Sequence, residues 1–67
     1  MVALKNFRRN HKLTQKQIAE SIGIDQRQWS RYENGQNEIP VRYIIAICEK
    51  YRVSADEVLE ITFEPIE

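Results

Sequence analysis

The six residues 26–31 include Gln26, Arg27 and Arg31. Each of these side chains can form two parallel hydrogen bonds with a single partner. The guanidinium of arginine fits the O6 and N7 atoms of guanine, and the amide of glutamine fits the N6 and N7 atoms of adenine. The chemistry that these residues could perform is therefore recognition of base edges, provided that the element carrying them can reach a nucleic acid.

Residue types that support catalysis are sparse in this chain. His11 is the single histidine and Cys48 the single cysteine, and nothing in the sequence places the two together as a nucleophile and its base. Two such ligands are too few for a structural zinc site, and the chain has no glycine-rich phosphate loop. The many carboxylates of the C-terminal half follow helix starts and surface positions. We therefore predict that the protein is not an enzyme and needs no cofactor or metal.

The 67 residues are enough for one small domain and no more. Two glycines and two prolines provide little material for the many tight turns of a β-sandwich. One cysteine cannot form an internal disulfide, and the longest apolar run, residues 44–48, is far shorter than the about 20 residues that cross a bilayer. No apolar segment follows Met1 as in a signal peptide. We expect a cytoplasmic protein without a membrane partner.

The charges are unevenly distributed, although ten basic and ten acidic residues give a formal net charge of zero. Residues 1–35 carry seven basic and three acidic residues, a net charge of +4, whereas residues 36–67 carry three and seven, a net charge of −4. A solvated helix surface would explain this equally well. The division nevertheless allows one face to attract a polyanion while the whole chain stays neutral.

Apolar spacing and capping residues predict five helices. A first segment covers roughly residues 2–11, and Thr14 with Gln17 forms a capping box that starts a second helix over 15–22. Gly23 ends that helix, because glycine adopts the left-handed conformation readily. Asp25, with Gln28 three residues later, forms a second capping box for a helix over about 26–33, which Asn34-Gly35 ends. Pro40 is expected as the first residue of a fourth helix, and Ser54 with Glu57 forms a third capping box for a short fifth helix.

Only Gly23 and Ile24 separate the second helix from the cap of the third. Two helices joined by so short a connection must cross steeply, and the small side chain of Ala19 faces the junction where they approach. This arrangement is a helix-turn-helix, whose second helix can enter the major groove of DNA. Short helical hairpins are common, so the connection alone is a weak indication.

The order and spacing of many further residues resemble the lambda-repressor-like (Cro/repressor, XRE) helix-turn-helix family over nearly all of residues 4–60. The matching positions are Leu4-Lys5-x-x-Arg8, Leu13-Thr14-Gln15, Ile18-Ala19, Gly23-Ile24, Ser30, Tyr32-Glu33-x-Gly35, Ile39-Pro40, Ile47 and Val53-Ser54-x-Asp56-Glu57-x-Leu59. The resemblance implies an all-α fold, a compact five-helix DNA-binding domain over residues 1–60. It also implies a homodimer that binds double-stranded DNA at an inverted-repeat operator.

The resemblance also assigns roles to individual residues of the predicted helix 26–33, which would be the recognition helix. Gln26, Arg27 and Arg31 match the outward positions that meet base edges. Asp25 is expected to be the cap, although its carboxylate could also accept from a cytosine amino group. Residues matched to contacts with the DNA backbone are Gln15, Gln28, Ser30, Asn34, Asn37 and Arg42. The residue matched by Gln15 also braces the recognition helix. Of these, Gln28 could equally serve as a capping residue, and Arg42 could equally point into solvent.

Other matched positions look structural. Arg8 and Glu33 correspond to a family pair that links the first helix to the third, and we predict a buried salt bridge between them. Trp29 stands where the family usually has isoleucine or valine, so a larger side chain is expected under the recognition helix. Lys12 occupies a position where glycine is frequent, which predicts a slightly different turn.

The last residues change period: Ile61 and Phe63 alternate with Thr62 and Glu64, a pattern typical of a short strand. Residues 61–67 could pack as an extended tail or pair with the same segment of a second subunit. The preferred function is a sequence-specific DNA-binding transcriptional regulator, specifically a repressor. Two alternatives remain open, an antitoxin whose main partner is a toxin protein, and a protein-interaction bundle without DNA binding.

Overall fold

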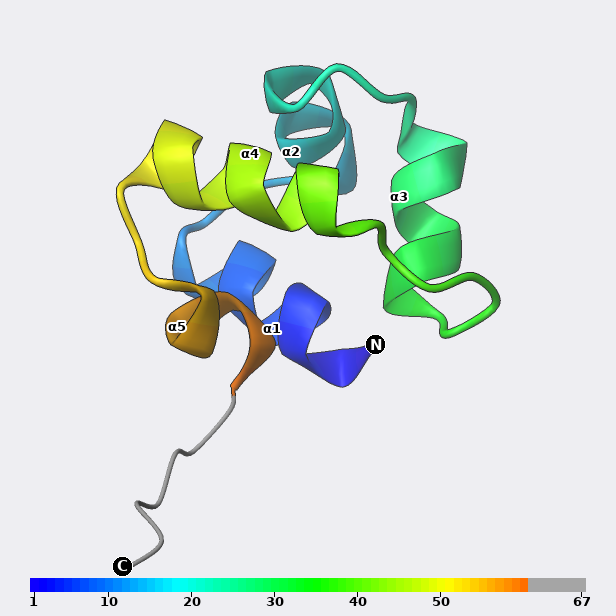
Figure 1. Ribbon diagram of the computed structural model, residues 1–67. Helices are drawn as coiled ribbons and strands as arrows, with labels where there is room; N and C mark the ends of the chain where they lie inside the picture. The colour runs from blue at the N-terminus through cyan, green and yellow to red at the C-terminus, as the bar shows by residue number, and fades with distance from the viewer. Residues whose placement is uncertain (61–67) are drawn as a thin grey trace, which may run out of the picture.

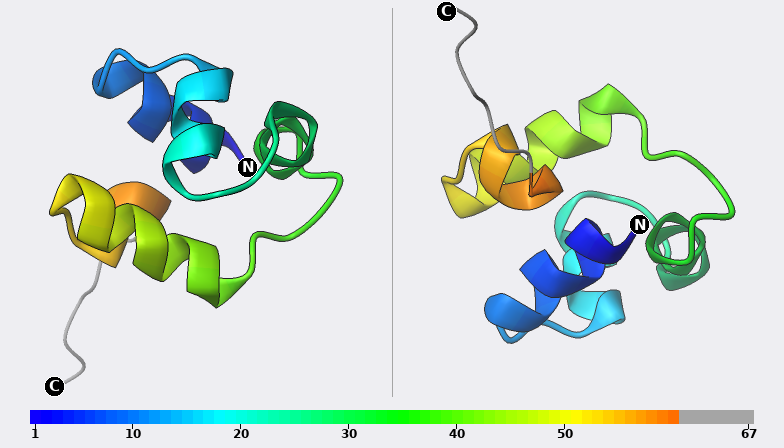
Figure 2. Two further views of the ribbon diagram at one scale, coloured as in Figure 1. Left: turned by 90° about the horizontal axis from the view of Figure 1, so that it is seen from above. Right: turned by 90° about the horizontal axis from the view of Figure 1, so that it is seen from below.

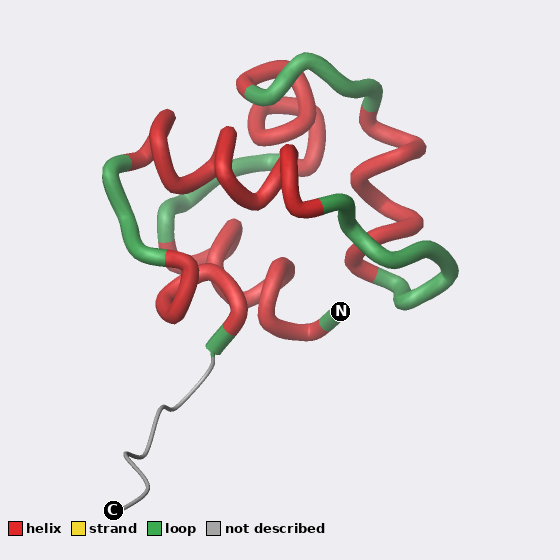
Figure 3. Tube along the Cα trace, viewed as in Figure 1, coloured by secondary structure: helices red, strands yellow, loops and turns green. Residues whose placement is uncertain are grey.

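The computed structural model describes residues 1–60, and this part of the chain folds into five helices with no strand (Figures 1 and 3). The predicted all-α architecture is therefore confirmed. The first two helices each end one residue earlier than predicted, and the predicted tail or strand over 61–67 lies outside the described residues. The helices are α1 (Val2–Asn10), α2 (Gln15–Ser21), α3 (Gln26–Glu33), α4 (Val41–Tyr51) and α5 (Ala55–Leu59).

The turn between α1 and α2 combines a complete capping box with a left-handed lysine. The Thr14 hydroxyl accepts from the backbone nitrogen of Gln17 at 3.0 Å, and the Gln17 side chain accepts from the Thr14 nitrogen at 2.8 Å. Just before this box, Lys12 has a φ of 56°, a conformation that costs residues with a Cβ about 1–2 kcal/mol. The lysine thus takes a backbone conformation that glycine would favour.

The starts of the other helices differ in detail from the predicted capping boxes. Asp25 accepts from the backbone nitrogen of Gln28 at 2.9 Å, and Ser54 accepts from that of Glu57 at 3.4 Å. Neither box is reciprocal, because the Gln28 and Glu57 side chains turn to other partners. Pro40 is the extended cap that precedes α4, with φ −62° and ψ 149°, and not the first residue of the helix.

The core is formed by all five helices and the turn between α2 and α3. Trp29 is completely buried, as expected of a large side chain beneath the recognition helix, and Ala19 is equally buried at the junction of α2 and α3. The carbonyl of Ala19 accepts from the backbone nitrogens of Ile22 and Ile24 across that turn. The core cluster consists of Leu4, Phe7, Ile18, Ala19, Ile24, Trp29, Tyr32, Ile47 and Val58.

The packing leaves one side of α3 free. Helices α2 and α3 pack against each other, α1 packs on α3 and α5, and α4 packs on α5. In Figure 1, α2 is seen nearly end-on while α3 runs lengthwise, so the two cross steeply. Both views in Figure 2 look almost along α3 and show it at the margin of the molecule, with the other helices on one side. This placement exposes the outward face of α3 to a ligand.

Candidate nucleic-acid interface

A buried carboxylate at the end of α3 fixes the helix to its neighbours. Arg8 from α1 approaches Glu33 with its Nε 2.6 Å from Oε2 and its Nη2 3.2 Å from Oε1. Trp29 donates its indole N–H to Oε2, and Gln15 at the start of α2 donates to Oε1 at 3.2 Å. Arg8 also donates to the carbonyl of Leu13 at 3.0 Å. Three helices are therefore joined through one side chain that is 3% exposed.

The electrostatics of this cluster favour the ionised carboxylate. Burial on its own would raise the pKa of Glu33. The hydrogen bonds from Arg8, Trp29 and Gln15, together with the positive charge of Arg8, outweigh that effect and hold the pKa of Glu33 below its ordinary value. Because these bonds are charge-assisted, they are stronger than bonds between neutral groups, so the end of α3 is held firmly.

A further contact joins the end of α3 to the start of α1. The amino group of Met1 donates to the backbone carbonyl oxygens of Tyr32 and Glu33, the first of them at 2.6 Å. The last carbonyl groups of a helix lack partners within the helix and carry partial negative charge, so a cation there is stabilising. The position of α3 is thus set from its C-terminal end.

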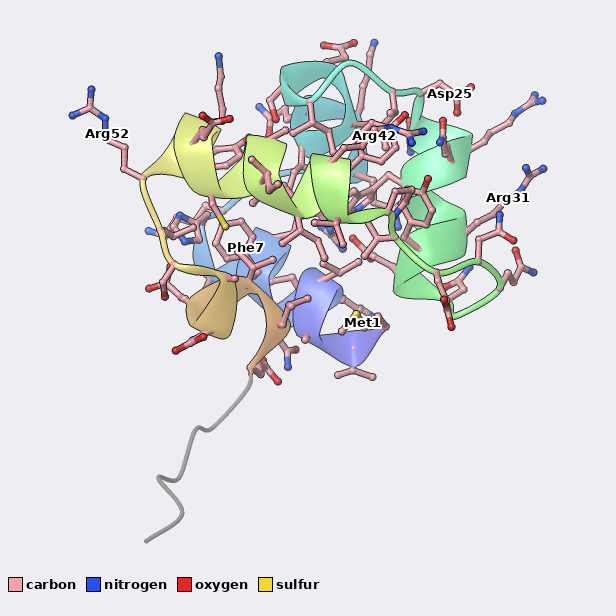
Figure 4. All side chains as sticks on the ribbon, viewed as in Figure 1. Met1, Phe7, Asp25, Arg31, Arg42 and Arg52 are labelled. Carbon is pink, nitrogen blue, oxygen red and sulfur yellow. The ribbon has the colours of Figure 1, made fainter. Side chains whose placement is uncertain are left out.

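The outward face of α3 presents the three predicted base-contacting side chains together. Gln26, Arg27 and Arg31 are all exposed, and Arg27 and Arg31 are one helical turn apart on the same face. In Figure 4, Arg31 points away from the body of the molecule. Within residues 1–60 the carboxylates that lie beside a basic side chain are Glu33, next to Arg8, and Glu57, next to His11, so neither arginine of this face is neutralised by a carboxylate.

Two shallow hollows flank this face, and Asp25, Arg27 and Arg31 border both of them. The two arginines therefore form a ridge between the hollows. The first hollow is completed by Gln15, Gln26, Ser30 and Gln36. The second is completed by Gln28, Tyr32, Asn37 and Glu38.

Five of the six predicted backbone-contact residues lie around this ridge or make contacts of their own beside it. Gln15 and Ser30 line the first hollow, and Asn37 lines the second. Gln28 is half-buried and donates its amide to the hydroxyl of Tyr32 at 2.7 Å. Asn34 is exposed at the end of α3, 3.5 Å from the Ser30 hydroxyl.

The sixth predicted backbone-contact residue, Arg42, projects from the start of α4 toward the side of α3 where Asp25 lies in Figure 4. Its guanidinium lies 4.6 Å from the ring centre of Tyr43, and its Nη2 is 3.4 Å from the Tyr43 hydroxyl. Sequence reasoning did not identify Tyr43 or Gln36 as part of this region. Neighbours in a helix point to different faces, so the adjacency of residues 42 and 43 gave no signal of contact.

The two residues considered for catalysis, His11 and Cys48, each contact other residues. The ring of His11 stacks against Phe7 at 4.2 Å between centroids, and its Nε2 is 3.6 Å from the carboxylate of Glu57. This acidic neighbour comes from α5, far away in the sequence, and was not foreseen. Cys48 is partly buried beside the core.

None of the five helices within residues 1–60 has the length and apolar character needed to span a membrane.

Two helices, α2 and α3, that cross steeply and are joined by a short turn containing Gly23 form a helix-turn-helix. A family model described as helix-turn-helix matches residues 4–58. The chain therefore belongs to the helix-turn-helix family, of the lambda-repressor-like type to which its residues are similar. No solved structure matches the chain significantly.

Two curated proteins are similar to the chain. The antitoxin PezA of Streptococcus pneumoniae serotype 4 is 41% identical over 51 residues, which are 76% of this chain and 32% of PezA. The uncharacterized HTH-type transcriptional regulator YobD of Bacillus subtilis is 36% identical over 62 residues, which are 92% of this chain and 55% of YobD. The chain thus spans about a third and about half of the lengths of these two relatives.

Proposed function

We propose that the protein is a sequence-specific, double-stranded DNA-binding transcriptional regulator. The observation that carries this proposal is the pair of exposed arginines, Arg27 and Arg31, one turn apart on α3 and without a carboxylate partner within residues 1–60. Guanidinium groups in this arrangement fit guanine edges in the major groove, and Gln26 beside them fits adenine. Helix α3 enters the major groove with this face forward.

Contacts with the sugar–phosphate backbone set the register of the recognition helix in this proposal. The two hollows beside the arginine ridge are where the flanking strands would lie. Their polar lining supplies hydrogen-bond donors, and Arg42 adds a charge that no carboxylate within residues 1–60 neutralises. The proposed backbone contacts are Gln15, Gln28, Ser30, Asn34, Asn37 and Arg42.

The proposed mode of action is repression by a homodimer at an inverted-repeat operator in the cytoplasm. A single recognition helix of eight residues covers few base pairs, and a symmetric dimer doubles the contacts on a symmetric site. The protein acts by binding alone in this proposal, without catalysis or a cofactor. Residues 1–60 form the DNA-binding domain, and residues 61–67 are a candidate dimer contact.

The similarity to the antitoxin PezA favours a second candidate function. In that case a toxin protein is the main partner, and DNA binding serves to regulate the pair. A toxin gene next to the gene of this protein, and a stable complex of the two products, would support this second function. Neither would be expected of a free-standing repressor.

Selection of bound duplexes from a random pool tests the proposed function. The full chain is incubated with random double-stranded DNA, and bound duplexes are amplified over several rounds. We expect enrichment of one half-site that contains guanine, repeated in inverted orientation at a fixed spacing. A pool that stays random would overturn the proposal and favour a bundle that binds only proteins.

A further inference from the structure

A chain of contacts runs from α3 to Arg42 through two tyrosines, and it begins at Gln28. The amide nitrogen of Gln28 donates to the hydroxyl of Tyr32 at 2.7 Å, one turn further along the helix. Tyr32 is only 4% exposed, yet it also borders the second hollow. Its ring therefore belongs to the core while its hydroxyl lies at the rim of the proposed interface.

The second step crosses from α3 to α4. The rings of Tyr32 and Tyr43 lie 6.3 Å apart between centroids at an interplanar angle of 42°, within the range of favourable aromatic pairs. The backbone nitrogen of Tyr43 donates to the carbonyl of Pro40 at 3.0 Å, which fixes this residue in the first turn of α4. The position of the Tyr43 ring is thus determined by the core on one side and by the helix start on the other.

The third step joins Tyr43 to Arg42. The guanidinium lies over the Tyr43 ring at 4.6 Å from its centre, and Nη2 is 3.4 Å from the hydroxyl. An arginine over an aromatic face is attracted by the ring quadrupole. Because Arg42 is exposed and has no carboxylate partner within residues 1–60, this ring is what holds the charged group in place.

We propose that Tyr43 is a positioning residue that holds the guanidinium of Arg42 ready for a DNA phosphate. The series Gln28, Tyr32, Tyr43, Arg42 ties that group to the recognition helix. This inference rests on the proposed DNA-binding function. A free arginine side chain would lose rotamer freedom on binding, and a group already held in its bound position loses less. The series also keeps the distance between the phosphate contact and the base contacts constant.

A double-mutant cycle on a selected duplex tests this inference. The affinities of wild type, Arg42→Ala, Tyr43→Leu and the double variant are measured at several salt concentrations. We expect Arg42→Ala to lower the slope of log K against log salt by about one unit. Tyr43→Leu should weaken binding by about 2- to 5-fold, the effect of one exposed cation–π contact, and should lower the slope in part. In the Arg42→Ala background, Tyr43→Leu should have no further effect.

Two additional variants separate positioning from folding. Tyr43→Phe keeps the ring beneath Arg42 and its packing on Tyr32, so we expect binding within about 2-fold of wild type. Tyr51→Leu makes the same change as Tyr43→Leu near the other end of α4, where Tyr51 packs on Phe7. It should leave the affinity and the salt slope unchanged even if it lowers stability.

The outcomes are distinct. A loss in Tyr43→Leu that persists at full size without Arg42, or that Tyr51→Leu reproduces, would overturn the positioning role. Unchanged binding by Tyr43→Leu would overturn it as well. Wild-type protein that binds no duplex would overturn the proposed function, and this inference with it. Wild-type binding combined with an inert Tyr43→Leu would overturn this inference alone.

Discussion

The Nε of Arg8 lies 2.6 Å from Oε2 of Glu33, and this ion pair joins α1 to the last residue of the recognition helix. The same carboxylate accepts from Trp29 and Gln15. One acidic side chain therefore connects the core, the start of α2 and the end of α3. The direction in which α3 presents its arginines depends on this cluster, which makes Glu33 a structural residue of the proposed interface.

Acid should weaken the fold through Glu33. Its pKa in the folded protein is below the ordinary value of 4.5, so the unfolded chain takes up the proton first as the pH falls. The stabilisation is complete above the ordinary pKa and is lost progressively as the pH falls from about 4.5 toward the lower folded value. The free energy of unfolding, measured by urea titration between pH 7 and pH 3, should decrease over that window.

A matched pair of variants assigns this loss to Glu33. Glu33→Gln removes the charge, should cost roughly 1.5–3 kcal/mol at pH 7 as the hydrogen bonds to the charged group are lost, and should flatten the decrease in acid. Glu20→Gln makes the same change at an exposed position of α2 and should retain the decrease. An acid profile of Glu33→Gln identical in shape to that of wild type would refute the assignment.

Replacing Trp29 should create a large cavity beneath α3. The side chain is completely buried, and loss of a large aromatic side chain from a core costs about 3–5 kcal/mol. We expect Trp29→Ala to lower the free energy of unfolding by this amount, measured by far-UV circular dichroism in urea because the single tryptophan is lost. A variant as stable as wild type would mean that the ring does not fill the core.

Glycine at position 12 should stabilise the protein. Lys12 has a φ of 56°, and glycine removes the strain of a Cβ there at the cost of greater backbone entropy in the unfolded chain. We expect Lys12→Gly to raise the free energy of unfolding, measured by urea titration, by roughly 0.5–1 kcal/mol. Lys5→Gly, the same exchange inside α1, should lower it by roughly 0.5–1 kcal/mol. Equal effects of the two variants would disprove the conformational explanation.

The sequence was sufficient for those parts of the structure that depend on local rules. The cap at Asp25, the complete box of Thr14 and Gln17 and the five helices follow from spacing and residue type. The predicted bounds of α3 match the structure because an N-cap and an Asn34-Gly35 stop enclose it. The short connection that Gly23 and Ile24 form was likewise enough to predict a turn between α2 and α3.

Contacts between helices could be predicted only in part. The pair of Arg8 and Glu33 was expected from the family resemblance, and the structure contains it. The resemblance implied that Gln15 braces the recognition helix, but it did not name Glu33 as the partner. That contact depends on the position at which α2 and α3 cross, which their short connection does not fix. The hydroxyl of Tyr32 lies within reach of Gln28 one turn earlier, but the apolar spacing of α3 indicated only a core ring.

Contact of the α3 arginines with base edges can be tested at Arg27. Affinities of wild type and Arg27→Ala are measured against the selected duplex and every single base-pair substitution of one half-site. We expect Arg27→Ala to lose about 1–3 kcal/mol of binding free energy and to relax the preference at one base pair, with preferences elsewhere unchanged. An equal loss on every duplex, with all preferences intact, would contradict it, because Arg27 would then contact only phosphate.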